Sequence, residues 1–300
     1  FIISLCQLGL VRVTALFVPL HTDTYSVHVR TRESDIARSS LALFGKAGSL
    51  RRIATGLDTS YRVKTVGGAV YALRVSSGMT IRRPSAYSVE AAWIDALSDN
   101  PWFRIPRVAR TSDGGCIATV LDDQSVPRAS TLLSWMEGRR CYRITEGHAR
   151  ALGQMVGVLH QNTRSSSAPP RGAIKSWDAT RMCGMGKKDE LRKFAPDAIG
   201  LVEDVYRTLG SVVTGLAPSE KGLINADVRL HNVLFHQGRA GLVDFNDAGV
   251  GPYGFCLGRL TESIRSMSRG AILADELLNG YREVTPLPPA YEQWGGLFEL

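Results

Sequence analysis

Three oxygen-bearing side chains in the last third of the chain have a spacing that suits phosphoryl transfer. Asp227 follows a short apolar run at 222–224, Asn232 comes five residues later, and Asp244 comes 17 residues after Asp227. Phosphoryl transfer needs an attacking oxygen in line with a phosphate and cations that neutralise the developing charge. One carboxylate can orient and deprotonate a hydroxyl group, while an amide oxygen and a second carboxylate can hold magnesium.

The elements around these residues are expected to bring them together. Residues 222–224 predict a strand, so that Asp227 lies in a loop at the strand end. Residues 233–235 and 240–243 predict two strands of a hairpin, joined by a turn at 236–239. The hairpin would bring Asn232 and Asp244 side by side, as two ligands of one metal require. Asp and Asn near turns often only bond their own backbone, but the apolar lead-in and the two strands favour the phosphotransferase interpretation.

This block resembles a known family, the aminoglycoside phosphotransferase-like kinases, which are relatives of the protein kinases. The family's usual pattern is H-x-D-x-x-x-x-N-V-L-F followed by I-D-F-D-D, and the chain has I-N-A-D-V-R-L-H-N-V-L-F followed by L-V-D-F-N-D. The similarity runs from about Leu41 to the end of the chain. It implies that Asp227 is the catalytic base, that Asn232 and Asp244 are the metal ligands, and that ATP and Mg²⁺ are the cofactors.

The resemblance also implies the fold class. We expect an α+β, bilobal protein-kinase-like fold, with a small antiparallel β-sheet lobe and a larger, mainly helical lobe. The expected domains are a leader or linker of uncertain order at 1–32, an N-terminal β-rich nucleotide-binding lobe at 33–134, a hinge at 135–138 and a C-terminal catalytic and substrate lobe at 139–300.

The chain departs from the family pattern at several positions. Asn225 stands where the family has a histidine that braces the catalytic loop, and asparagine can also donate and accept hydrogen bonds. Arg229 and His231 make the loop bulkier and more basic, and Cys256 replaces a loop-anchoring aspartate. These departures keep open a second hypothesis, a catalytically weakened pseudokinase or nucleotide-binding module.

The other half of such a site needs a strand cation over the phosphates and a helix acid that holds the cation. Strands are expected over 60–66 and 69–75, and Arg74 lies near the end of the second. A helix is expected over 84–98 and carries Glu90 near its start. Arg74 and Glu90 therefore match the cation–acid pair of the family, although either residue type is also common on surfaces.

Two further segments are candidates for nucleotide binding. The loop that ends at Ser60 precedes the hairpin and could lie over phosphates, although it has a single glycine and no G-x-G-x-x-G pattern. The segment 135–138 is expected to be the hinge, and its backbone at Met136 could take the adenine edge as in the family. A plain connector is the alternative for this segment.

A long helix is expected over 145–161, with Thr145 as its N-cap and with Ala149, Leu152 and Val156 on one buried face. His160 lies at its end. A histidine at such a position is more often a buried hydrogen-bonding residue than a catalyst.

Composition sets the broad class. The chain has 300 residues, 44% hydrophobic content, a formal net charge of +8 and five scattered cysteines without a C-x-x-C pair. A basic balance suits anionic ligands, but no nucleic-acid-binding motif is present, so no nucleic acid partner is expected. The cysteines indicate reduced thiols and a cytoplasmic protein. The apolar stretch 1–20 could be a membrane or signal segment, but Arg12 interrupts it and a membrane association is not expected.

The sequence therefore predicts an ATP-dependent kinase that transfers the γ-phosphoryl group to a hydroxyl group of a small molecule. A Ser/Thr protein kinase is a further alternative, but no A-P-E pattern follows Asp244. The acceptor and the oligomeric state are not specified by these patterns.

Overall fold

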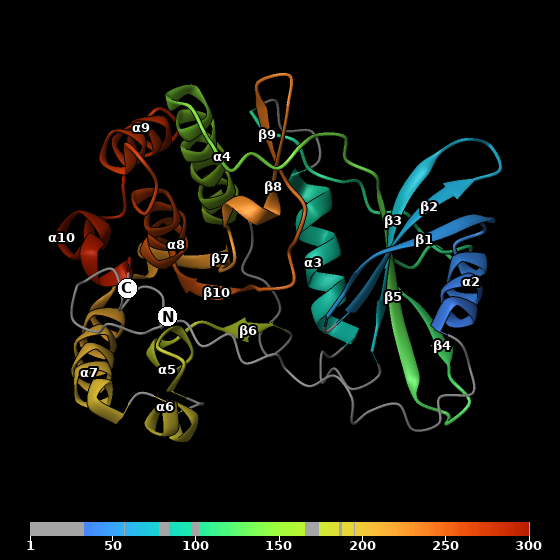
Figure 1. Ribbon diagram of the computed structural model, residues 1–300, viewed down its shortest axis with the longest axis horizontal. Helices are drawn as coiled ribbons and strands as arrows, with labels where there is room; N and C mark the ends of the chain where they lie inside the picture. The colour runs from blue at the N-terminus through green and yellow to red at the C-terminus, as the bar shows by residue number, and fades with distance from the viewer. Residues whose placement is uncertain are drawn as a thin grey trace. The chain divides into compact units, whose positions relative to one another are not determined.

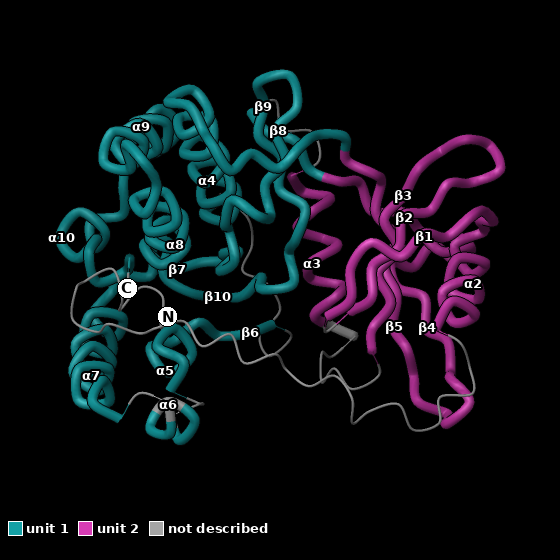
Figure 2. Tube along the Cα trace, viewed as in Figure 1, with its two compact units in different colours: residues 1–14, 99–105, 137–300 teal, residues 15–98, 106–136 magenta. Residues whose placement is uncertain are grey.

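The computed structural model describes residues 33–56, 58–77, 84–97, 102–165, 174–185, 188–194 and 196–299. They form two compact units (Figure 2). The small unit contains the described residues up to 97 and those at 106–136, and the large unit contains 102–105 and 137–299. The second boundary lies between Met136 and Glu137, within the segment expected to be a hinge. Residues 102–105 group with the large unit, although they fall within the range expected for the N-terminal lobe. The leader expected at 1–32 lies outside the described residues.

The small unit is an antiparallel sheet with two helices (Figure 1). The elements are α2 (Glu33–Leu43), β1 (Gly48–Thr55), β2 (Asp58–Thr65), β3 (Val70–Ser76), α3 (Pro84–Leu97), β4 (Ala118–Leu121) and β5 (Pro127–Ser134). The five strands have the order β1-β2-β3-β5-β4. The expected hairpin corresponds to β2 and β3, while β1 was not anticipated. Residues 107–110 lie outside the strands and pair with β5 through one isolated bridge, Val108 with Leu133.

Strand alternation separates the two faces of this sheet. Tyr61 and Val63 of β2 and Leu73 of β3 are buried in the core that α2 covers. Arg74 points to the opposite face, where it contacts α3 through Glu90. The cation of the expected pair is therefore placed by the two-residue period of β3.

The large unit contains most of the helices. Its helices of more than four residues are α4 (Glu146–Ser165), α6 (Lys188–Phe194), α7 (Ile199–Gly215), α8 (Tyr253–Arg265), α9 (Gly270–Arg282) and α10 (Pro289–Phe298), and α5 (Ala179–Met182) is shorter. Single turns of 3-10 helix cover Pro196–Ala198, Pro218–Glu220 and Leu230–Asn232. The strands are β6 (Lys175–Ser176), β7 (Lys221–Asn225), β8 (Val233–His236), β9 (Arg239–Leu242) and β10 (Ala248–Pro252). They form a sheet of order β6-β10-β7 and a hairpin of β8 with β9. The predicted hairpin is present, while β6 and β10 were not anticipated.

Helix α4 follows its predicted pattern. Thr145 accepts a hydrogen bond from the His148 backbone N–H at 3.3 Å, as an N-cap does. Ala149, Leu152 and Val156 are fully buried. His160 is also fully buried, and its Nδ1 lies 2.9 Å from the Tyr281 hydroxyl. The interpretation of His160 as a buried hydrogen-bonding residue is confirmed.

In the part of the chain that the structure describes, none of the helices combines the length and the apolar character needed to cross a bilayer. The described cysteines, Cys116, Cys141, Cys183 and Cys256, are free thiols.

Candidate active site

The loop after β7 is closed by its own side chains. Strand β7 ends at Asn225, and Asp227 lies in the turn that follows. Asn232 Nδ2 donates to the Asp227 main-chain oxygen at 3.0 Å and to Asp227 Oδ2 at 2.8 Å. The D-x-x-x-x-N spacing is therefore that of a tight loop in which the asparagine holds the carboxylate. Both bonds use Nδ2, so Oδ1 is the atom of this amide that is left for a cation.

The β8–β9 hairpin brings the second carboxylate to the same place. Val233 pairs with Leu242, and the Val243 N–H donates to the Asn232 main-chain oxygen at 3.1 Å. Asp244 follows directly, and its Oδ1 accepts the Asn246 N–H at 2.9 Å. This bond is that of an Asx turn, which fixes the direction of the side chain. Asn232 and Asp244 thus lie at the same open end of the hairpin.

Two basic residues flank Asp227. Arg229 Nε lies 3.1 Å from Oδ1, and His231 Nε2 lies 3.6 Å from Oδ2. Burial raises the pKa of Asp227, the charges of Arg229 and His231 lower it, and the charge of Asp247 raises it. The net direction is upward, which is the direction expected for a group that accepts a proton near neutral pH.

The donor set fits magnesium. Mg²⁺ binds to proteins through one or two carboxylates, together with waters and substrate phosphates, rather than in an all-protein cage. One Asp244 carboxylate and one Asn232 amide oxygen match that pattern. Among the described residues no cluster of three or more His, Cys, Asp and Glu side chains could hold a metal ion, so phosphate oxygens would have to complete the shell.

The small unit contains the other predicted residues. Arg74 Nη2 lies 2.8 Å and 3.0 Å from the two oxygens of Glu90, and both side chains are buried. Ser60 lies directly across from Arg74 in the β2–β3 ladder. Met136 lies at the end of this unit, and its side chain is buried. The structure thus brings Arg74, Glu90 and Ser60 together within the small unit, and Asp227, Asn232 and Asp244 within the large unit.

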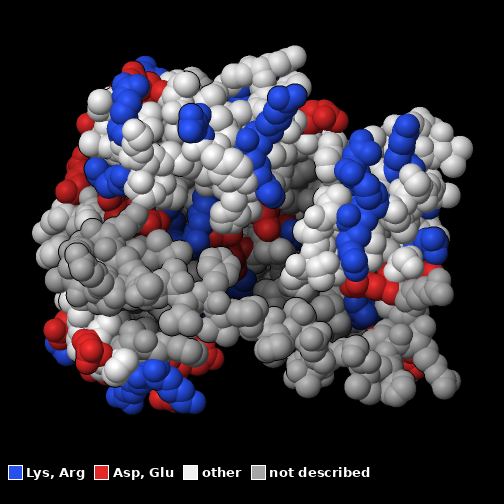
Figure 3. Space-filling model, viewed as in Figure 1, with Lys and Arg blue, Asp and Glu red and all other residues white. Residues whose placement is uncertain are grey.

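The sheet face that carries Arg74 is basic. Arg51 of β1 lies opposite Arg62 of β2, and Lys64 lies two residues further along β2 on the same face. Figure 3 shows Lys and Arg side chains gathered over the strands of the small unit. Like charges directly opposite each other destabilise a strand pair, whereas such a face suits anionic phosphate groups.

Sequence reasoning missed three residues next to this site. Lys175 and Trp177 contact the turn that follows Asp244, and Asp247 is the partner of Lys175. Asp247 could have been suspected from its place in the N-D pair after Phe245. No sequence signal pointed to Lys175, because its contact spans 72 residues. Cys256, noted as a departure from the family, is fully buried, and burial raises the pKa of its thiol to about 12.

Residues 49–297 match the family model described as "Phosphotransferase enzyme family". The chain belongs to this family. The predicted resemblance is confirmed, and the match spans both halves of the predicted site. A search of curated proteins found no match.

Solved structures support the fold of this phosphotransferase. An amicoumacin kinase, in complex with AMP-PNP, Ca²⁺ and Ami, is 20% identical, with a TM-score of 0.74 over 90% of this chain and 83% of that chain. A microcompartment-associated aminopropanol kinase is 26% identical, with a TM-score of 0.69 over 89% of this chain and 85% of that chain. A macrolide 2'-phosphotransferase from Brachybacterium faecium is 17% identical, with a TM-score of 0.56 over 88% and 87% of the two chains. The predicted kinase-like α+β fold is confirmed.

Proposed function

We propose that this phosphotransferase uses ATP and magnesium to phosphorylate a hydroxyl group of a small molecule. The observation that carries the proposal is the closed loop in which Asn232 bonds Asp227, at the open end of the hairpin that leads to Asp244. An acid, an amide and a second acid are the groups that this chemistry requires.

Each residue has a distinct part in the proposed reaction. Asp227 accepts the proton of the acceptor hydroxyl and orients its oxygen toward the γ-phosphate. Asn232 Oδ1 and the Asp244 carboxylate would hold magnesium, which would supply positive charge against the phosphates. Arg74, steadied by Glu90 and paired across the ladder with Ser60, would contact the phosphates of a bound nucleotide, and the Met136 backbone would take the adenine edge.

The similar structures make a small-molecule acceptor the best-supported choice. Their names specify amicoumacin, aminopropanol and macrolides as the compounds on which those proteins act. We propose a small-molecule alcohol for this chain too, and a cytoplasmic enzyme that has no nucleic acid partner. The test is magnesium-dependent transfer of labelled phosphate from ATP to a panel of alcohols.

Two variants decide the assignment. Asp227→Ala should lower transfer by at least about 100-fold, because a general base contributes about 10²–10⁴-fold. Asp244→Ala should lower it by a similar factor, because the carboxylate ligand of the proposed magnesium ion is lost. Asp204→Ala is the control, because Asp204 is an exposed acid on α7 that pairs only locally with Arg207. Wild-type turnover in both site variants would refute the proposal.

A nucleotide-binding module without transfer is the second candidate. The contacts of Asp227 favour it, because Arg229 Nε lies 3.1 Å from Oδ1 and Asn232 Nδ2 donates to Oδ2 at 2.8 Å, so both oxygens that would receive the acceptor have a close partner. Nucleotide-dependent thermal stabilisation without transfer to any alcohol of the panel would support this candidate.

A further inference from the structure

A short segment outside the predicted motifs is fastened to the turn that carries Asp244. Lys175 Nζ donates to the Asn246 main-chain oxygen at 3.0 Å and forms an ion pair with the Asp247 carboxylate. Both contacts fall on residues two and three positions after Asp244. The ammonium group therefore bridges the backbone and a side chain of the same turn.

Trp177 extends this attachment to the loop of Asp227. Its indole Nε1 donates to the Asp247 main-chain oxygen at 3.1 Å. The same oxygen accepts the Ala226 N–H at 3.2 Å, and Ala226 directly precedes Asp227. A single carbonyl thus joins the segment 175–177, the loop of the proposed base and the turn of the proposed metal ligand.

The attachment depends on close backbone approach. Strand β6 pairs in parallel with β10, and the Trp177 N–H donates to the Val250 main-chain oxygen at 2.7 Å. A Cβ at Gly249 would lie 2.6 Å from the Lys175 main-chain oxygen, and one at Gly251 would lie 2.7 Å from Trp177 Cβ. Both distances are shorter than real Cβ contacts, so β10 accepts this segment because it has glycine at both positions.

The charges give Lys175 a second role. Asp247 adds a third carboxylate to the loop and turn that carry Asp227 and Asp244. A carboxylate without a counter-ion would compete for the cation that Asn232 and Asp244 are proposed to hold. Lys175 is the cation that the structure pairs with Asp247, and both side chains are about one-third exposed, at 34% and 37%.

We propose that Lys175 is a positioning residue of the phosphotransferase site, which fixes the turn of Asp244 and neutralises Asp247. The proposal rests on the proposed function, because it assigns Lys175 to the magnesium ligand of that reaction. Partners that orient a metal ligand affect metal affinity or activity by about 10- to 100-fold.

The test compares Lys175→Met with Lys175→Arg in the full chain. Two properties are measured: kcat with KM for the acceptor, and the magnesium concentration that half-saturates thermal stabilisation by AMP-PNP. K175M should lower kcat or the apparent magnesium affinity by about 10- to 100-fold and change the acceptor KM little. K175R keeps the charge and should recover most of the loss. Arg207→Met, which removes an exposed ion pair on α7, is the matched control and should behave as wild type.

A double variant separates this role from general stability. If Lys175 acts on Asp247, K175M should cost less in an Asp247→Asn background than in the wild type, because the charge to be neutralised is gone. If K175M does not fold, Trp177→Phe tests the same attachment, since it removes the indole donor to the Asp247 oxygen. The proposal would be overturned if K175M had wild-type kcat and magnesium affinity. It would also be overturned if K175M caused the same loss in the wild type and in the Asp247→Asn background.

The magnesium titration does not need an acceptor. If wild-type protein transfers no phosphate but binds AMP-PNP with magnesium, the proposed function fails while Lys175 is still tested. If transfer occurs and is lost in Asp244→Ala but not in K175M, the proposed function stands and the inference about Lys175 fails.

Discussion

The side chain of Asn225 donates a hydrogen bond from Nδ2 to the main-chain oxygen of Asp244, at 2.5 Å. Its Oδ1 accepts the Asp227 N–H at 3.0 Å. Asn225 itself is fully buried. One side chain thus ties the segment of the proposed base to the segment of the proposed metal ligand, at the position where the family pattern has histidine.

Asn225 variants should separate the two hydrogen bonds. Asn225→Ala removes both and should cost about 1–3 kcal/mol of unfolding free energy, because buried backbone groups lose their partners. Its kcat should fall by about 10- to 100-fold. Asn225→His keeps a donor and an acceptor and should lose less stability and kcat than Asn225→Ala. Asn225→Asp keeps only the acceptor and should lose more than Asn225→His. Denaturant unfolding and steady-state transfer measure the two effects, and equal activity of all three variants would contradict the bridging role.

The buried Arg74–Glu90 pair should contribute differently to stability and to catalysis. Glu90→Gln removes the charge of the carboxylate that lies 2.8 Å from the buried Arg74 guanidinium, and we expect a loss of about 3–5 kcal/mol of unfolding free energy. The double change Arg74→Met with Glu90→Leu removes both charges and should recover most of that stability. It should still raise the KM for ATP, because the guanidinium group proposed to contact the phosphates is gone.

In the double variant the free energy of unfolding, measured with denaturant, should therefore return toward the wild-type value while the KM for ATP stays raised. The surface pair Arg38–Asp35, with 67% and 50% exposed side chains, provides the control, since Asp35→Asn should change stability by less than about 1 kcal/mol. A normal KM for ATP in the double variant would show that Arg74 does not bind the nucleotide.

Local patterns could be predicted well, and long-range contacts could not. The β8–β9 hairpin, the buried face of α4 and the strand position of Arg74 follow from alternation and helical periodicity, which are visible in one stretch of sequence. Strand β1 was missed because residues 48–55 are almost all exposed and show no alternation. Strand β6 has two residues, and its partner β10 contains two glycines and a proline among five residues, so neither strand shows alternation in the sequence. The attachment of Lys175 to Asp247 joins residues 72 positions apart, which no local rule specifies.

His160 should make stability depend on pH. Burial lowers its pKa from 6.5 to about 3, with a further contribution from the charge of Arg164. The unfolded chain binds this proton below about pH 6.5 and the folded chain does not, so stability is complete above that pH and falls as the pH decreases. The slope is about 1.4 kcal/mol for each pH unit between the two pKa values.

Denaturant unfolding at pH 7.5, 6.5 and 5.5 measures this slope in the wild type and in His160→Gln. The variant cannot gain the proton, so its stability should fall less between pH 6.5 and 5.5, although it should be less stable at pH 7.5. His236→Gln, at a partly exposed site in β8, is the matched control for the loss of a histidine side chain. A parallel pH profile in His160→Gln would exclude His160 as the source.

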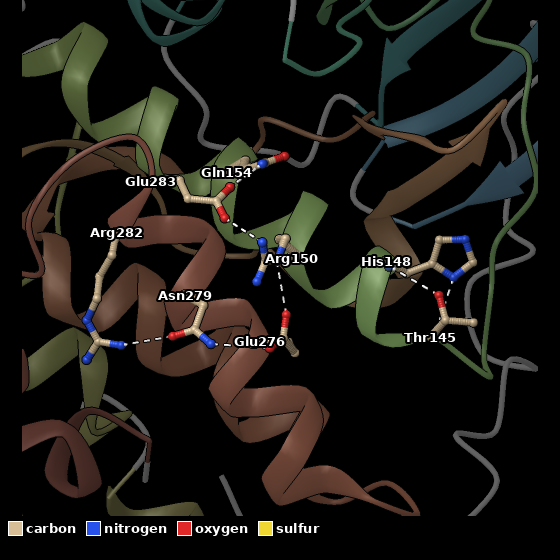
Figure 4. Close-up of polar contacts among 8 residues, drawn as sticks. All are labelled: Thr145, His148, Arg150, Gln154, Glu276, Asn279, Arg282 and Glu283. Carbon is tan, nitrogen blue, oxygen red and sulfur yellow. Dashed lines mark hydrogen bonds and ion pairs between the residues drawn. The ribbon is translucent and has the colours of Figure 1, made fainter.

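Glycine allows α4 and α9 to pack in direct backbone contact. A Cβ at Gly280 of α9 would lie 2.0 Å from the Arg150 main-chain oxygen, and one at Gly153 of α4 would lie 1.8 Å from the Leu277 main-chain oxygen. At the same crossing, Arg150 bonds Glu276 at 3.0 Å and Glu283 at 2.7 Å (Figure 4). These ion pairs are partly exposed and contribute little to the free energy of unfolding, so the glycines should control how stably α4 packs against α9.

Gly280→Ala should therefore destabilise the protein by about 1–3 kcal/mol, because the helices must move apart to accept the methyl group. Gly210→Ala is the matched control within α7, where the nearest atom to the new Cβ is Ala179 Cβ at 3.8 Å. There alanine should stabilise by up to about 1 kcal/mol through its higher helix propensity. Thermal or denaturant unfolding measures both variants, and a stabilising effect of Gly280→Ala would show that the two helices separate at no cost.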